Sequence, residues 1–232
     1  MTQAHGSKLR VLSSNGVHGA LTQLGPQFER ESGHTLDVSF GTANALATRI
    51  AAGERGDVAI LTAPVLAALA QQGITGGVRL LARSGAGVAV RAGAARPDIS
   101  TVEAFKRTLL AAPSIVYTRL GASGIYFAGL IDRLDIGDAV RAKATIPDGG
   151  LVGEFLAAGT VELAIQQIPE LMAVAGVDIV GAFPDEIQVW TVMAAAPFSA
   201  APHAAAAQAL VELLASPSAL TLYQAQGMKA TV

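Results

Sequence analysis

The stretch VSFGTANALATRIAAGERGDVAIL, residues 38–61, decides the fold class. Its first residues alternate between apolar and polar, as in a strand, and a short polar loop follows at residues 41–44. Residues 45–52 have the apolar spacing of a helix that ends at Gly53, and residues 58–61 form a second, apolar strand. Strand, loop, helix and strand in this order predict a βαβ unit with parallel strands.

The same unit recurs on both sides of this stretch. On the N-terminal side, a strand at residues 8–13 meets a turn at Asn15-Gly16 and then a helix at residues 17–32. On the C-terminal side, further strands are expected at residues 114–117, 142–146 and 163–166, with helices at residues 64–72, 101–110, 124–134, 151–158 and 203–215. The pattern predicts α/β architecture with doubly wound, parallel sheets, in which ligands bind at loops after the carboxyl ends of strands.

Two crossings divide the chain into lobes. Residues 79–91 read as a long strand that is broken near residues 84–87, where a glycine-rich centre suits a crossing, and residues 187–194 read as a strand that returns. We therefore expect lobe 1 to comprise residues 1–82 and 190–232, and lobe 2 residues 83–189, with a ligand cleft between the lobes.

Composition excludes several classes of function. Of the 232 residues 51% are hydrophobic, which excludes disorder, and a net charge of −2 without a basic run argues against nucleic acid as a partner. The chain has no cysteine, and its four histidines are far apart, so we expect no metal site and no cofactor. Charges or glycines interrupt every apolar run, so no membrane span is expected.

The N-terminus MTQAHGSK runs into the first strand without the apolar stretch of a secretory signal. The sequence as given therefore predicts a cytoplasmic protein. The alternative is a periplasmic protein whose leader has been removed.

Five segments in order resemble the type II periplasmic solute-binding proteins of the molybdate-binding group. These segments are VLSSNGVHGAL (11–21), the stretch 38–61, GASGIYFAGLIDRLDI (121–136), ELAIQQIPEL (162–171) and YQAQGMKA (223–230). The resemblance covers nearly the whole chain, and it implies the two-lobed fold of that group. It also implies that relatives that bind oxyanions use hydroxyls of the first two loops, backbone amides of the middle lobe and a tyrosine hydroxyl.

Three side chains that this resemblance implies for molybdate are substituted. Gly16 stands at the first-loop position, Ala43 at the second-loop serine position and Gln167 at the tyrosine position. Ser123-Gly124 and Gly149-Gly150 match the two backbone-amide loops. A bare oxyanion needs donors only, so these substitutions argue against molybdate.

The remaining candidates form a set rich in side-chain amides. Amides offer donors and acceptors, which suits a carboxylate together with a hydroxyl or a protonated group, and Arg119 adds a bidentate carboxylate donor or is an ordinary surface arginine. We thus expect a small organic anion as ligand. The predicted ligand-binding residues are Ser14, Asn15, Gly16, Thr42, Ala43, Asn44, Arg119, Ser123, Gly124, Gly149, Gln166 and Gln167, with Ser13 beside them.

Two functions fit this interpretation. The first is a solute-binding protein that captures the anion and passes it to a permease of an ABC transporter. The alternative, which the resemblance also implies, is an isomerase of a small unsaturated polycarboxylate such as aconitate, with His18 as general base, because an imidazole titrates near neutral pH. His18 could instead be a solvent-facing histidine, Tyr126 is expected to pack, and Asp57 is expected to be structural.

Overall fold

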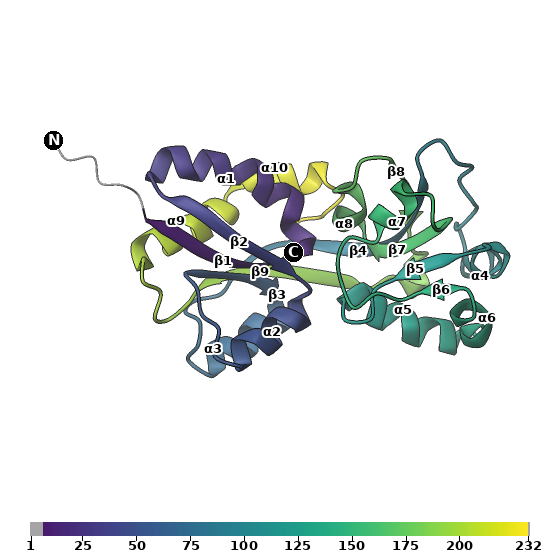
Figure 1. Ribbon diagram of the computed structural model, residues 1–232, viewed down its shortest axis with the longest axis horizontal. Helices are drawn as coiled ribbons and strands as arrows, with labels where there is room; N and C mark the ends of the chain where they lie inside the picture. Colours follow the sequence, from purple (N-terminus) through teal and green to yellow (C-terminus); the bar gives the residue numbers. More distant parts are fainter. Residues whose placement is uncertain (1–6, 232) are drawn as a thin grey trace. The chain divides into compact units, whose positions relative to one another are not determined.

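The computed structural model describes residues 7–231, which form two α/β units (Figure 1). The first unit comprises the chain up to Arg83 and again from Val192, and the second comprises Ser84–Thr191. Residues 1–6 and 232, which the sequence analysis assigned to lobe 1, lie outside the described residues. The chain changes units within a strand both times, in β4 (Arg79–Arg91) and in β9 (Trp190–Pro197).

The first unit is built on four strands in the order β2-β1-β3-β9. In chain order, and apart from β9, its elements are β1 (Lys8–Ser14), η1 (Asn15–Val17), α1 (His18–Ser32), β2 (Thr35–Gly41), α2 (Ala43–Ala51), β3 (Val58–Thr62), α3 (Ala63–Gln71), α9 (Ala204–Leu214) and α10 (Pro217–Ala225). Strands β2, β1 and β3 are parallel, and β9 is antiparallel to β3.

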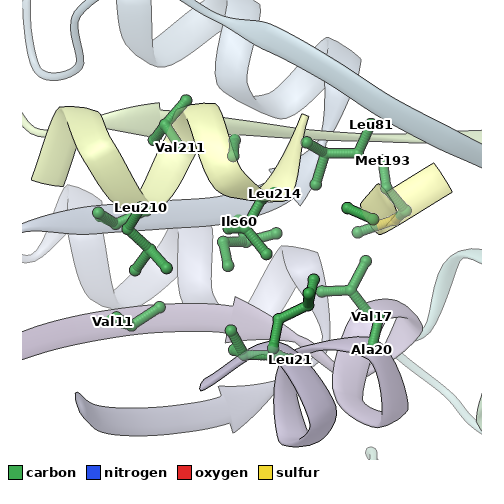
Figure 2. Close-up of a cluster of buried hydrophobic side chains, with 14 of the residues drawn as sticks. Val11, Val17, Ala20, Leu21, Ile60, Leu81, Met193, Leu210, Val211 and Leu214 are labelled. Atoms are coloured by element: carbon green, nitrogen blue, oxygen red, sulfur yellow. The ribbon is translucent and has the colours of Figure 1, made fainter. Parts of the chain in front are cut away.

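Alternation along these strands creates two apolar layers in the first unit. In β1, Val11 faces the cluster formed with α1, α9 and α10, whereas the next residue, Leu12, faces the cluster formed with α2 and α3. Figure 1 shows α1 and α10 on one side of this sheet and α2 and α3 on the other. Figure 2 shows the first cluster, in which Leu210 and Leu214 of α9 point toward Val11 and Ile60 of the sheet.

The second unit has parallel strands β7, β5 and β6, with β4 antiparallel to both β7 and β8. Its elements are α4 (Val102–Ala111), β5 (Ile115–Tyr117), α5 (Ala122–Arg133), α6 (Gly137–Arg141), β6 (Ala144–Thr145), α7 (Gly153–Ala157), β7 (Leu163–Gln167), α8 (Ile168–Met172), β8 (Val177–Ala182) and η2 (Asp185–Ile187). Helices α4 and α5 pack on one face of this sheet, and α7 and α8 on the other.

The two-unit α/β fold is confirmed, but several details of the prediction were wrong. The sheets are mixed rather than wholly parallel, because β4, β8 and β9 run antiparallel to their neighbours. Strand β4 is not broken near residues 84–87. Gly87 allows a close approach there instead, since a Cβ would lie 2.6 Å from Ile168 Cγ1 and 2.9 Å from the Gly181 carbonyl oxygen.

Element boundaries account for the other differences. Helices α2 and α5 begin at Ala43 and Ala122, so part of each predicted polar loop is the first helical turn. The strand expected from residue 187 begins at Trp190, after the short helix η2, and α6 was not predicted. Earlier helix starts matter for function, because they turn loop residues into helix N-termini.

Among the described residues, no single helix is long and apolar enough to cross a membrane. Helices α9 and α10 pass that test only when taken together, and they are bent by 56° relative to each other.

Candidate functional site

In the first unit, the predicted residues gather at one edge of the sheet. Strands β1 and β2 are parallel and in register, with Ser14 opposite Gly41, so the segments that follow them meet at the same edge. We call residues 13–18 and 41–45 the first-unit loops. They bring together two groups of predicted residues, Ser14, Asn15 and Gly16 after β1 and Thr42, Ala43 and Asn44 after β2.

The hydroxyls of the first-unit loops mostly cap their own backbone. Thr42 Oγ1 accepts a hydrogen bond from the Ala45 N–H at 3.2 Å, which makes Thr42 the N-cap of α2. Ser14 Oγ accepts from the Gly16 N–H at 3.4 Å, and Ser13 Oγ donates to the Ser14 carbonyl at 3.1 Å. The local sequence thus fixes these turns with its own side chains.

Gly16 lies in the short helix η1, and His18 is the first residue of α1, which follows it directly. A Cβ at Gly16 would lie 3.3 Å from Met193 Sδ, so close packing against β9 explains why this position holds no side chain. His18 is half-buried, and its ring lies 4.3 Å from that of Phe40 at the end of β2. His18 is the one ionisable side chain in the first-unit loops.

In the second unit, three loops follow the carboxyl ends of β5, β6 and β7. We call residues 118–124, 146–152 and 166–167 the second-unit loops. Because β5 is parallel to both β6 and β7, these loops lie at one edge of this sheet. They contain the predicted residues Arg119, Ser123, Gly124, Gly149, Gln166 and Gln167.

Hydrogen bonds tie the second-unit loops together. The backbone N–H groups of Arg119 and Leu120 donate to the carbonyls of Pro147 and Asp148, and Arg119 Nε donates to Asp148 Oδ1 at 3.0 Å. This ion pair is exposed, so it contributes little to stability, but it gives Arg119 an acidic partner inside the unit. A contact of Arg119 with a ligand stays a prediction.

The two glutamines are both buried and both hydrogen-bonded inside the unit. Gln166 Oε1 accepts from the Val152 N–H at 2.9 Å, and its Nε2 donates to the Gly150 carbonyl at 2.8 Å. Gln167 Oε1 accepts from Ser84 Oγ, and its Nε2 donates to Thr191 Oγ1 at 2.9 Å. In the structure, both glutamines hold loops in place. Each side-chain amide has two N–H donors and uses one of them in these bonds, so the predicted ligand contact would use the second.

The N-terminus of α5 lacks a side-chain cap. Its N-cap is Gly121, and the two residues at its second and third positions, Ser123 and Gly124, are buried. A Cβ at Gly124 would lie 1.8 Å from the Thr118 carbonyl oxygen, so the backbone of Thr118 packs directly on this turn. The first N–H groups of a helix have no partner within the helix and carry partial positive charge, which suits an anionic oxygen.

Thr118 is a residue that the sequence analysis missed. It is 1% exposed, and within the part of the chain that the structure describes its Oγ1 makes no hydrogen bond. That oxygen faces the α5 N-terminus, since a Cβ at Gly121 would lie 2.3 Å from it. Its position directly after an apolar strand and before Arg119 was the signal that could have identified it.

Glu170 is a second missed residue, in the first turn of α8. The backbone N–H of Gln167, the N-cap of this helix, hydrogen-bonds its carboxylate, as in half of a capping box. Burial nevertheless dominates and raises the pKa of Glu170 to about 8. The acid therefore adjoins Gln167 and carries a proton at neutral pH.

Two residues have the packing roles expected for them. Asp57 is 2% exposed and accepts hydrogen bonds from the backbone N–H groups of Arg10 and His203, both at 2.9 Å. Tyr126 donates to the Ile187 carbonyl at 2.8 Å. No cluster of three metal-binding side chains occurs in residues 7–231, a range that excludes His5.

Comparison with known proteins places this chain in a family. Over 229 residues it is 37% identical to an aconitate isomerase from Pseudomonas sp, covering 95% of this chain and 87% of that protein. The fold is that of the periplasmic molybdate-binding protein of Azotobacter vinelandii, with a TM-score of 0.80 at 19% identity over 97% of this chain and all of that chain. It is also that of the sulfate-binding protein SubI from Mycobacterium tuberculosis H37Rv, with a TM-score of 0.71 at 16% identity over 96% and 86% of the two chains.

A family model described as bacterial extracellular solute-binding protein matches residues 9–229. This match spans both units and both sets of loops. The chain therefore belongs to the family of bacterial extracellular solute-binding proteins.

Proposed function

We propose that this protein binds a small unsaturated polycarboxylate and isomerises it, with aconitate as the first substrate to test. The observation that carries the proposal is the uncapped start of α5, whose helix N–H groups at Ser123-Gly124 suit a carboxylate. The 37% identity to an aconitate isomerase supports the same chemistry.

The donors suit carboxylates better than a tetrahedral oxyanion. The positions that the resemblance assigns to hydroxyl side chains hold Gly16, Ala43 and Gln167, and no hydroxyl replaces them there. Helix N–H groups bind carboxylate oxygens well, and the second N–H of Gln166 or Gln167 would add a neutral donor. Neutral donors spread over several groups fit a ligand that carries several separated carboxylates.

The proposed reaction is a proton shift. His18 in its neutral form removes a proton from the methylene carbon beside a carboxylate, and the electron pair of that C–H bond forms a new double bond to the central carbon. The electrons of the original double bond move to its far carbon, and the negative charge spreads into the carboxylate there. The imidazolium then returns the proton to the far carbon of the original double bond. Composition and oxidation state are unchanged, and N–H donors stabilise the charge that develops on the carboxylate.

Thermal unfolding with a ligand panel tests binding. We expect cis-aconitate or trans-aconitate at a hundredfold excess over Kd to stabilise the protein by about 2.7 kcal/mol, a shift of about 5–10 °C for a chain of this size. Molybdate, tungstate and sulfate should leave the melting temperature unchanged. Stabilisation by molybdate alone would overturn the carboxylate proposal.

Proton NMR in D2O tests the chemistry. Incubation with cis-aconitate should produce the trans isomer and incorporate deuterium at the carbon that receives the returned proton. His18→Gln should slow conversion at least about a hundredfold, the lower range of general-base catalysis. His34→Gln is the matched control, because His34 lies outside both sets of loops, 5.8 Å from the ring of His203.

The second candidate function is a receptor, which the family description favours. Under that hypothesis the protein binds the same carboxylate tightly, releases it to a transporter permease and does not convert it. Tight binding of aconitate with no deuterium incorporation would support the receptor and reject the isomerase.

A further inference from the structure

A cavity of about 700 Å³ opens on the second unit, at the opposite edge of the sheet from the second-unit loops. Its lining residues lie within the segments 90–98, 104–113 and 159–163, and Arg96 is not among them; we call it the far-edge cavity. Strands β5 and β7 begin beside it, at Ile115 and Leu163, whereas the second-unit loops follow the other ends of these strands. The length of β7 separates the two places by about 13 Å, at roughly 3.3 Å per residue.

The walls of the far-edge cavity are apolar and made of small side chains. They include Ala94, Pro97, Ala104, Ala111, Val161 and Leu163. Of these, Ala104, Val161 and Leu163 are buried parts of the unit, so the walls belong to the folded core rather than to loose surface loops. A volume of this size lies within the range of sites for small organic molecules, which are mostly apolar with a few placed polar groups.

Two arginines, Arg91 and Arg107, supply the positive charge of this cavity. Among residues 7–231, every arginine that forms an ion pair is a different one: Arg10, Arg49, Arg96, Arg119 and Arg141. The Arg91 guanidinium lies over Gly159, where a Cβ would be 3.3 Å from Nη1, so glycine leaves room for this side chain at the cavity wall.

The two acids at the cavity differ in their surroundings. Asp98 accepts a hydrogen bond from the Ser100 N–H at 2.9 Å, and this bond together with the charge of Arg107 lowers its pKa. Glu162 is exposed beside the cavity. Asp98 is thus hydrogen-bonded to Ser100 and lies near the charge of Arg107, while Arg91 has no acid within ion-pair distance among the residues that the structure describes.

We propose that the far-edge cavity binds a monocarboxylate with an apolar body, its carboxylate on Arg91 and its hydrocarbon against the alanine and proline walls. Guanidinium–carboxylate pairing is bidentate and directional, which fits a ligand with one charged end. The anionic Asp98 and Glu162 beside the cavity repel additional carboxylates, so a polycarboxylate such as citrate is rejected. This selectivity is opposite to that proposed for the loops at the other edge.

Two-dimensional NMR of the uniformly ¹⁵N-labelled protein with sodium hexanoate tests this site. We expect saturable shifts of the backbone amides of Ala94, Ala111 and Gly159, and no such shifts with citrate. Hexan-1-ol, which lacks the carboxylate, should bind at least tenfold more weakly.

Arg91→Gln should weaken hexanoate binding at least tenfold. Arg96→Gln is the matched control, because Arg96 is also exposed and lies five residues after Arg91, but it pairs with Asp178 and does not line the cavity. It should change the Kd less than twofold. Ala94→Phe, at an exposed position of the lining, should fill the cavity and abolish the shifts without touching Arg91.

Several results would overturn the proposal. They are shifts confined to the second-unit loops, equal affinity for hexan-1-ol and hexanoate, unchanged binding in both Arg91→Gln and Ala94→Phe, or no shifts at any hexanoate concentration up to its solubility.

Discussion

Two helices that begin in the candidate binding loops, α2 in the first unit and α5 in the second, start in different ways. In the first unit, Thr42 caps α2 with its own hydroxyl. In the second unit, α5 begins at Gly121 with no side-chain cap, and the buried hydroxyl of Thr118 beside it has no partner in the described part of the chain. A capped helix start has already used part of its donor capacity, whereas an uncapped one keeps it for a ligand.

The reach of the side-chain hydrogen bonds also differs between the two sets of loops. The second-unit loops are linked by the side chain of Gln166 and by the backbone bonds of Arg119 and Leu120 to residues 147–148. In the first-unit loops, the side-chain bonds of Ser13, Ser14 and Thr42 run to near neighbours in sequence. We infer that the second unit holds open donors on a fixed frame, which is what preorganised binding of an anion requires.

The largest expected effect comes from closing the uncapped helix start. Gly124→Ala forces a Cβ to within 1.8 Å of the Thr118 carbonyl, so the turn has to move, and we expect a loss of about 3 kcal/mol in the free energy of unfolding together with loss of ligand binding. Urea denaturation and the ligand thermal shift measure both. Gly129→Ala in the same helix is the control, and it should stabilise the protein by up to about 1 kcal/mol, because a Cβ there comes only within 3.5 Å of the end of the Arg133 side chain. Equal behaviour of the two variants would show that the turn is not tightly packed.

The next largest loss of stability is expected on removing the side-chain amide of Gln166, which links residues 150 and 152 to β7. Gln166→Leu leaves the Val152 N–H and the Gly150 carbonyl without their side-chain partner in a buried region, at a cost of about 2 kcal/mol. Hydrogen exchange should then accelerate at residues 150–152 and leave the first-unit loops unchanged. Gln208→Leu should cost less than about 0.5 kcal/mol, because Gln208 is exposed and its side chain bonds Glu212 one turn away on the helix surface. Faster hydrogen exchange in both units would contradict a role of Gln166 that is confined to the second-unit loops.

Glu170 makes the stability of the second unit depend on pH. Its pKa is raised to about 8 by burial, above the ordinary value of 4.5, so the folded state holds a proton that the unfolded chain releases. The contribution is fully present below about pH 4.5 and is lost as the pH rises toward 8. Glu170→Gln keeps the helix cap and removes the titration, so its stability relative to the parent should increase by at least about 1 kcal/mol between pH 5 and pH 8.5, as measured by urea denaturation. The exposed Glu162→Gln is the control, and a parallel increase in it would refute the assignment to Glu170.

A cap comparison isolates the contribution of Thr42. Thr42→Ala and Thr101→Ala each remove an N-cap hydroxyl, of α2 and α4 respectively, and each should cost about 1 kcal/mol. Only Thr42→Ala should also weaken ligand binding, because Thr101 lies outside both sets of loops. Isothermal titration calorimetry with aconitate separates the two, and equal affinities would remove Thr42 from the site.

The smallest change in the free energy of unfolding is expected at Thr118, where removal of a polar group should not destabilise the protein. Thr118→Val replaces a buried hydroxyl that has no partner among the described residues with a methyl group of similar size, so stability should stay equal or increase by about 0.5–1 kcal/mol. Ligand affinity should fall at the same time, because the hydroxyl faces the α5 N-terminus. A variant that loses stability but binds normally would make the hydroxyl structural.

The sequence alone was sufficient for the architecture, whereas the candidate binding positions stay predictions. Gly53, which follows α2 with a φ of 103°, the alternation in β2 and the apolar run of β3 are local signals, and they identified the βαβ unit correctly. The antiparallel direction of β4 and β9 could not be read, because strand direction depends on pairing between residues far apart in the chain.

The roles of the site residues needed the structure for a related reason. The sequence does not reveal that Gln166 bonds Gly150 and Val152, and it does not reveal that the hydroxyl of Thr118 is buried beside Gly121. Hydrogen-bond satisfaction is a property of three-dimensional neighbours, and one sequence contains no record of them.

The division of the chain at β4 and β9 has a consequence for biosynthesis. The second unit is one continuous stretch, Ser84–Thr191, whereas the apolar cluster of the first unit needs Met193 and the helices α9 and α10. A ribosome therefore releases every residue of the second unit before the first unit can bury its core. During that interval the exposed faces of α1 and β1 are a target for chaperones, and a translation pause after residue 191 would lengthen their exposure while leaving the second unit free to fold.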